Sequence, residues 1–163
     1  GTQAHPSAAD VLGYAWLARA SFFVADDPGL VGELYVGVAL VERSRALDPT
    51  YQDYGATTVL ASYYARSPQG PEFEQGVKLF QEAIEKTQRK SLTVLYNYAN
   101  RVHCGKSDRA AYEKTMHEIL DAGDLDEQRR LTNAIAKLRA RRALSVQRMM
   151  DCGFDMSQPP SKG

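Results

Sequence analysis

The sequence predicts an all-α fold built from stacked antiparallel helical hairpins. Apolar residues recur at spacings of three and four through nearly all of the 163 residues, and no segment sustains the alternation of a half-buried strand. Clusters of proline, glycine and aspartate interrupt this pattern and mark short connections between helices. Because short connections make successive helices antiparallel neighbours, we expect about seven helices in a degenerate array of hairpins.

Breaker residues place the helices of the first half. These helices are expected at residues 8–24, 29–47, 52–66 and 72–87. Pro6-Ser7 gives a start signal for the first helix, and Asp48-Pro49 ends the second. The helix at 72–87 carries an apolar face with spacings of four, three and four, formed by Phe73, Val77, Phe80 and Ile84. Such a face predicts a helix that packs on one side against its neighbours.

The second half contains the remaining helices, which are expected at residues 91–103, 107–123 and 125–150, followed by a loose tail at 157–163. Ser91 is the expected N-cap of the first of them, and Ser107 starts the next. Asp124, with Glu127 three residues on, resembles a capping box at the start of the last helix. The apolar line of that helix is expected on Leu131, Ile135, Leu138 and Val146. We expect residues 1–163 to form one domain, with the helical array at 8–150.

The charge balance argues against two classes of partner. The chain has 20 basic and 20 acidic residues, for a formal net charge of zero, which provides no net field for nucleic acid or an anionic membrane. The longest apolar run, Leu34–Val41, is far shorter than the roughly 20 residues of a membrane-spanning helix. We therefore expect no nucleic-acid partner and no membrane span.

No residues can be assembled into a catalytic or metal site. Gly105-Lys106-Ser107 matches the end of a phosphate-binding loop, but Asn100 replaces the preceding glycine and a helix is expected in place of the strand. The three histidines have no carboxylate or cysteine at metal-ligand spacing. No serine lies in a nucleophile elbow, and no pair of carboxylates stands apart from the other charges. We expect a binding module with no catalytic residues, cofactor or metal.

A search for internal repeats finds the spacing of the tetratricopeptide (TPR) pattern. In the second helix of such a hairpin, a large apolar residue lies between two small ones, four positions after the first and three before the second. Two sets fit, Gly37, Val41 and Ser44, and Gly76, Phe80 and Ala83. Leu60-Ala61 followed by Tyr64 fits the first helix. The array is therefore expected to be TPR-like, and one functional interpretation is a generic adaptor that captures a peptide in its concave groove.

Tyrosines gather in the helices expected to line the concave face of this array. With nearby polar side chains they form the candidate groove residues, which are Tyr54, Tyr63, Tyr64, Thr93, Tyr96, Asn100 and His103. Tyrosine combines an apolar ring with a polar tip, which suits a groove for a small apolar or amphipathic ligand. Core packing is the alternative explanation for most of these tyrosines.

Basic residues concentrate in the last expected helix. They are Arg129, Arg130, Lys137, Arg139, Arg141, Arg142 and Arg148. A solvated helix face accounts for such a distribution, and docking onto an acidic partner or ligand is the alternative.

Motifs along the chain also occur in an order that matches a known family. They lie in the segments Leu47–Tyr51, Leu60–Pro68, Leu95–Ala99 and Arg130–Ala140. This order resembles the TatT family, the T components associated with TRAP transporters, over about residues 28–147. Its structural motif residues would be Leu60, Ala61, Leu131, Asn133 and Ala136. The stretch Asn100–Cys104 departs from the more apolar sequence expected after the fifth helix.

The resemblance implies an exported, periplasm-facing accessory subunit of a TRAP-type solute uptake system. It also implies that the protein binds the extracytoplasmic substrate-binding subunit and assembles with itself as a trimer. A small apolar or amphipathic ligand handled by the helical fold is a further implication of the resemblance.

The two cysteines, Cys104 and Cys152, lie outside CxxC and CxxxxH patterns. The helix at 91–103 ends on one side of the array, the next helix leaves from that side, and the last helix returns to it. Gly153 then allows a turn that brings Cys152 back toward Cys104. An oxidising compartment would give a disulfide, and a reducing compartment would give two free thiols.

Overall fold

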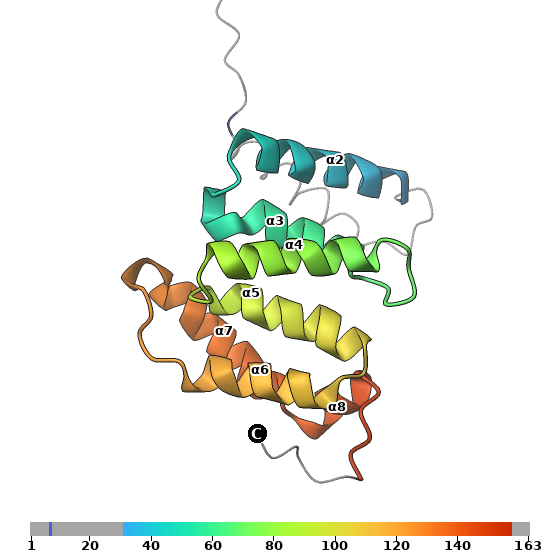
Figure 1. The fold of residues 1–163 in the computed structure, drawn as a ribbon, viewed down its shortest axis with the longest axis vertical. Coiled ribbons are helices and arrows are strands. Elements are labelled where there is room, and N and C mark those ends of the chain that lie inside the picture. Colours follow the sequence, from blue (N-terminus) through green and yellow to red (C-terminus); the bar gives the residue numbers. More distant parts are fainter. Residues whose placement is uncertain (1–6, 8–30, 158–163) are drawn as a thin grey trace, which may run out of the picture. The chain divides into compact units, whose positions relative to one another are not determined.

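The computed structural model describes residue 7 and residues 31–157, in which every regular element is a helix and no strand occurs. This confirms the all-α fold class. The chain divides into two compact units, residues 1–60 and residues 61–163. Within each unit, successive helices form the antiparallel hairpins expected from the sequence (Figure 1).

Two expected segments lie outside the described residues, namely the first helix at 8–24 and all but the first residue of the tail at 157–163. Among the helices that the structure does describe, none is long and apolar enough to span a bilayer. That residues 1–163 form one domain stays a prediction.

The first unit contains one described hairpin, formed by α2 (Val31–Leu47) and the part of α3 (Tyr51–Tyr64) up to residue 60. The turn between them is held by Asp48, whose carboxylate accepts hydrogen bonds from the Thr50 hydroxyl at 2.7 Å and the Thr50 N–H at 2.9 Å. These bonds favour the ionised carboxylate and lower the pKa of Asp48.

Helix α3 begins with an irregular turn. Gln52, Asp53 and Tyr54 have left-handed φ values of 49°, 57° and 62°, so the regular helix starts after Tyr54 and not at residue 52 as expected. Beyond this turn, Arg45 of α2 donates a hydrogen bond from Nε to Thr57 Oγ1 at 3.1 Å, which ties the two helices together.

The second unit begins with the last turn of α3 and helix α4 (Phe73–Lys86). Helix α4 buries Phe73, Val77 and Phe80 on one side, and Ile84 is half-buried on the same side. The apolar face expected for this helix is thus confirmed.

At Gly76, helix α4 lies close against the last turn of α3. A Cβ atom at this position would lie 2.6 Å from the Ala65 nitrogen and 2.8 Å from the Ala61 carbonyl oxygen. Both contacts are with backbone atoms, so no side chain could move aside to make room. The small residue in the repeat spacing is therefore required by the packing of these helices.

The next hairpin consists of α5 (Leu92–Tyr98), a π-helical turn at Ala99–His103, and α6 (Arg109–Asp121). Asp108 caps α6 by accepting a hydrogen bond from the Ala111 N–H at 3.0 Å. The helix therefore begins at Arg109, and the start expected at Ser107 is wrong because the aspartate carboxylate, not the serine hydroxyl, satisfies the free N–H.

The prediction of a single helix at residues 125–150 is wrong. The structure has a short 3-10 turn (Glu127–Arg129), helix α7 (Arg130–Ala143) and helix α8 (Val146–Asp151). The break falls at Ser145, whose extended backbone (φ −67°, ψ 146°) precedes α8. The expected capping box is also replaced, because Asp126 accepts the hydrogen bond from the Gln128 N–H at 3.0 Å.

Helix α7 packs against α5 and α6 with its small residues. The buried side chains of its inner face are Asn133, Ala136, Ala140 and Ala143. The apolar line expected to pack inward points outward instead, with exposed fractions of 72% for Leu131, 41% for Ile135 and 55% for Leu138. Val146, now in α8, is exposed as well. Small inward residues let the helix backbones approach closely, which leaves the larger side chains outside.

Candidate functional site

A π-helical turn is the most unusual feature among the candidate groove residues. In an α-helix, residues five apart point in different directions, whereas the wider π turn brings them to the same side. The Tyr98 and His103 rings meet in this way, edge to face, with centroids 4.7 Å apart. On its other side, Tyr98 contacts Phe80 of α4 at 5.7 Å. The turn therefore builds an aromatic cluster of Phe80, Tyr98 and His103.

The electrostatics of this cluster favour a neutral imidazole. His103 is half-buried, and burial lowers its pKa below the ordinary value. At neutral pH the ring is uncharged and can offer one donor and one acceptor beside the tyrosine. An apolar body with a few polar tips is the composition expected for a site that holds an amphipathic ligand.

The other expected groove residues of α5 face different neighbours. The Thr93 hydroxyl donates to the Thr132 carbonyl of α7 at 3.4 Å. Tyr96 packs, partly buried, against the core formed by α5, α6 and α7. Asn100 lies within the π turn and is partly exposed. The structure thus divides the stripe of Thr93, Tyr96, Asn100 and His103, since only His103 joins the aromatic cluster through a ring contact.

The tyrosines of α3 form a second aromatic feature. In the second unit, the Tyr63 and Tyr64 rings meet edge to face at 5.3 Å, and the Arg66 guanidinium lies 4.0 Å from the Tyr63 ring centroid. Arg66 also pairs with Glu72 at 3.0 Å. Tyr54 belongs to the first unit and is half-buried at the irregular start of α3. The groove assignment of these three tyrosines stays a prediction.

Asn133 locks the inner face of α7 to the connection before α5. Its Oδ1 accepts a hydrogen bond from the Leu92 N–H at 3.0 Å, and its Nδ2 donates to the Lys90 carbonyl at 3.0 Å. The oxygen and the nitrogen of the buried amide each have a hydrogen-bond partner, and the oxygen also satisfies a backbone N–H that is free at the start of α5. The resemblance implied a structural role for Asn133 as a family-motif residue, and that assignment stays a prediction.

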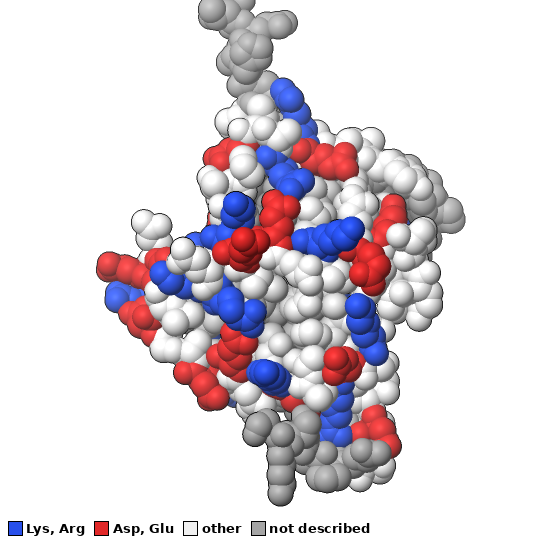
Figure 2. Space-filling model, in the orientation of Figure 1, with Lys and Arg blue, Asp and Glu red and all other residues white. Residues whose placement is uncertain are grey.

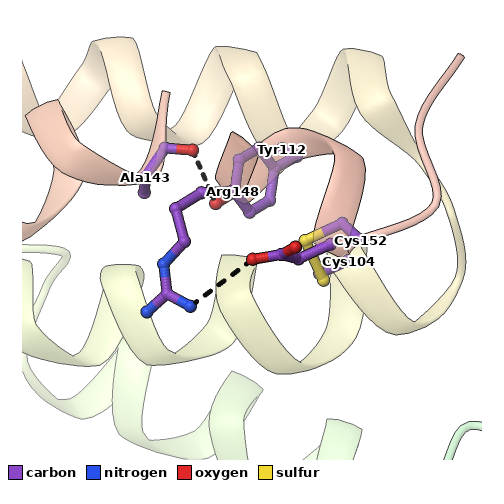
Figure 3. The surroundings of a disulfide bond; sticks show 6 residues. Cys104, Tyr112, Ala143, Arg148 and Cys152 are labelled. Atoms are coloured by element: carbon purple, nitrogen blue, oxygen red, sulfur yellow. Dashed lines mark hydrogen bonds and ion pairs between the residues drawn. A yellow bond between two sulfur atoms is a disulfide. The ribbon is translucent and has the colours of Figure 1, made fainter. Parts of the chain in front are cut away.

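A disulfide joins Cys104, after the π turn, to Cys152 at the end of α8, with an S–S distance of 2.10 Å (Figure 3). Gly153 follows with a φ of 74°, a conformation that favours glycine, and the chain turns there. The two cysteines that the sequence singled out are therefore covalently paired in the structure.

Side-chain contacts near the disulfide also hold the C-terminal segment that follows α8. The buried Tyr112 hydroxyl donates to the Ala143 carbonyl at 3.2 Å (Figure 3). The Tyr112 ring also meets the Phe154 ring edge to face at 5.1 Å. Burial raises the pKa of Tyr112 to about 12. Arg109 donates to the Asp155 carbonyl at 2.7 Å. We call the disulfide with the Tyr112–Phe154 and Arg109–Asp155 contacts the C-terminal clamp.

Acidic and basic side chains alternate over the face of the molecule shown in Figure 2, in agreement with the zero net charge. Helix α7 differs locally, because its exposed apolar residues lie among arginines. Within residues 31–157, no group of three or more His, Cys, Asp or Glu side chains is placed to hold a metal ion.

Two residues that shape these features lie outside the expected groove set. Tyr98 is one of the clustered tyrosines but lies off the α-helical stripe, and it meets His103 only because of the π turn, which has no clear sequence signal. Phe154 lies beyond the last expected helix, but an aromatic residue after Cys152 and Gly153 could have suggested a packed C-terminal turn.

Comparison with known proteins gives one match. The model of the family described as TRAP transporter T-component matches residues 10–150. Searches of curated proteins and of solved structures returned no match. Because the family match spans most of the 163 residues, the chain belongs to the TRAP transporter T-component family.

Proposed function

We propose that this protein is a non-enzymatic, TPR-like accessory subunit of a TRAP-type solute uptake system and binds the system's extracytoplasmic substrate-binding subunit. The observation that carries the proposal is the family match over residues 10–150. The exposed leucine and isoleucine side chains of α7 support a docking role, because large apolar groups gathered on a surface mark interaction sites.

The C-terminal clamp supports an exported, periplasmic location. Disulfides persist in oxidising compartments and are rare where thiols are kept reduced. A bond between Cys104 and Cys152 is therefore expected of a protein that meets the extracytoplasmic subunit of a transporter.

A small apolar or amphipathic ligand is a second part of the proposal. The half-buried rings of Tyr98 and His103 and the partly exposed Asn100 provide an apolar surface with polar tips. Replacing Tyr98 and His103 with alanine should weaken the binding of such a ligand more than replacing exposed arginines. Unchanged affinity in variants with wild-type circular dichroism would move the ligand elsewhere.

Self-association, with a trimer as the expected state, completes the proposal. Light scattering over a range of protein concentrations measures the mass directly. A mass that stays that of one chain at every concentration would contradict this part of the proposal and leave subunit binding intact.

Subunit binding is tested by calorimetric titration of the purified full chain with the substrate-binding subunit of the same TRAP system. A saturable complex is expected. A substrate-binding protein from an unrelated transporter class is the matched control and should give no heat of binding. The absence of a complex at concentrations of about 100 μM, well above a dissociation constant of about 1 μM, would contradict the proposed function.

A further inference from the structure

Helix α7 presents a strip of large aliphatic side chains to solvent. Leu131, Ile135 and Leu138 follow one another at spacings of four and three, so they lie on one side of the helix, and all are exposed. The strip extends over about 10 Å of helix. The inner face of α7 is filled by small residues and already packs against α5 and α6, so the strip takes no part in that packing.

The residues around the strip are basic. Residues 130–150 contain no aspartate or glutamate. Three of the basic side chains in this stretch have partners, since Arg130 pairs with Asp124 at 2.7 Å, Arg148 pairs with Asp151 at 3.8 Å, and Lys137 donates to the Ala122 carbonyl. Arg139, Arg141 and Arg142 are exposed, and no ion pair within the described part of the chain involves them.

The three arginines surround the strip in a regular way. On a helix with 3.6 residues per turn, Arg139 and Arg141 lie about 80° to either side of the strip. Arg142 continues the strip at its C-terminal end. At the N-terminal end of the strip, Arg130 pairs with Asp124 and Glu127, so the unpaired charge beside the strip is positive. An apolar centre flanked by unpaired charge of one sign is the arrangement of a protein interface whose partner carries the opposite charge.

Other occupants fit this face less well. A second copy that met this face with its own outer α7 face would bring arginines against arginines, which disfavours two-fold pairing. A cyclic trimer would set the face against a different surface of the neighbouring copy, and the mass of the L131Q/L138Q variant distinguishes that case. A membrane surface is also a poor match, because the strip has no aromatic residue and the zero net charge of the chain gives no general attraction to anionic lipid.

We infer that the outer face of α7, formed by Leu131, Ile135, Leu138, Arg139, Arg141 and Arg142, docks an apolar patch rimmed by acidic residues on the substrate-binding subunit. This inference rests on the proposed function and adds the surface and the chemistry of the contact. The rim supplies attraction and orientation, and the aliphatic strip excludes water from the centre.

The test measures binding of the substrate-binding subunit by the full chain and by two groups of variants. L131Q/L138Q removes the apolar centre, and R139E/R141E/R142E reverses the rim. Each should weaken the complex at least tenfold. Added salt should weaken the wild-type complex but not that of the charge-reversed variant, where it screens a repulsion. The matched controls are V36Q, at another exposed apolar position, and K78E/K86E/K114E, at other exposed lysines, and both should stay within twofold of wild type.

Each remaining outcome overturns the inference in a distinguishable way. If all variants bind the subunit as tightly as wild type does, the α7 surface is not the docking site, and the proposed function still stands. No wild-type complex at all removes both. If L131Q/L138Q has a different mass from wild type by light scattering, measured without the subunit, the face forms contacts between copies of the chain. If the wild-type protein sediments with phosphatidylglycerol vesicles, and R139E/R141E/R142E does not but still binds the subunit normally, the outer face of α7 binds lipid.

Discussion

Helices α4 and α7 are each 14 residues long, and each has one apolar face of large side chains, but only α4 turns that face toward the core. Phe80 of α4 is fully buried, whereas Leu131 of α7 has an exposed fraction of 72%. The inner face of α7 consists of alanines and Asn133 instead. Apolar periodicity thus locates a face on a helix, and the size of the residues on the opposite face decides which one packs inward.

The two helices are also held in place in different ways. Helix α4 is held by burial of large side chains, which provide about 1.5–3 kcal/mol each when fully buried. Helix α7 buries little apolar volume per residue and depends on close backbone approach, on the hydrogen bonds of Asn133 and on the C-terminal clamp that follows it.

The largest effect is expected for Phe80→Ala in α4. Removing a fully buried aromatic ring leaves a cavity and should lower the free energy of unfolding by about 3–5 kcal/mol. Urea denaturation followed by circular dichroism measures this change, with the exposed Gln81→Ala as control. A loss below about 1 kcal/mol would show that α4 is not held by its apolar face.

Reduction of the disulfide should come next in size. In the chain-entropy model, opening the bond across a sequence separation of 48 lowers the free energy of unfolding by about 4 kcal/mol. Cys104→Ser/Cys152→Ser should match the reduced wild type in urea denaturation. A free-thiol assay on denatured, unreduced protein should find no thiol, and two reactive thiols would refute the pairing.

Substitution of Asn133 by the similarly sized leucine tests the inner face of α7. The Leu92 N–H and the Lys90 carbonyl lose their partners, and an unsatisfied buried group costs about 1–3 kcal/mol. We expect a loss of about 2 kcal/mol in thermal or urea denaturation. Thr132→Ala, on the exposed side of the same helix, is the control. A neutral Asn133→Leu would mean that shape alone fixes this face.

The smallest effect is expected on the outer face of α7. Leu131→Ala and Leu138→Ala should each change the free energy of unfolding by less than about 0.5 kcal/mol, because exposed side chains contribute little to folding. Losses near those of buried leucines would show that the strip packs within the protein. That result would also contradict its availability to a partner.

The sequence allows much of the fold to be predicted, for reasons that individual elements illustrate. The face of α4 was predictable because Phe73, Val77 and Phe80 are large and regularly spaced. The orientation of α7 could not be predicted, because this helix has both a line of alanines and a line of large aliphatic residues. Which line packs inward depends on how closely α5 and α6 approach α7.

The candidate site was predictable only in part. His103 was singled out, but its contact with Tyr98 arises from a π turn that regular helical spacing cannot represent. The break at Ser145 was missed because local propensity there is compatible with a continuous helix, whereas the clamp beyond it requires a change of direction. Nonlocal contacts decided both outcomes.

The clamp also determines how this chain reaches its mature form. Among these 163 residues the two cysteines allow one intramolecular pairing, so their pairing requires an oxidant but no choice between alternative partners. The bond can close only after α6, α7 and α8 have all left the ribosome and any translocation pore. Cross-linking between two chains is then the competing reaction, and its yield should rise with protein concentration during oxidation.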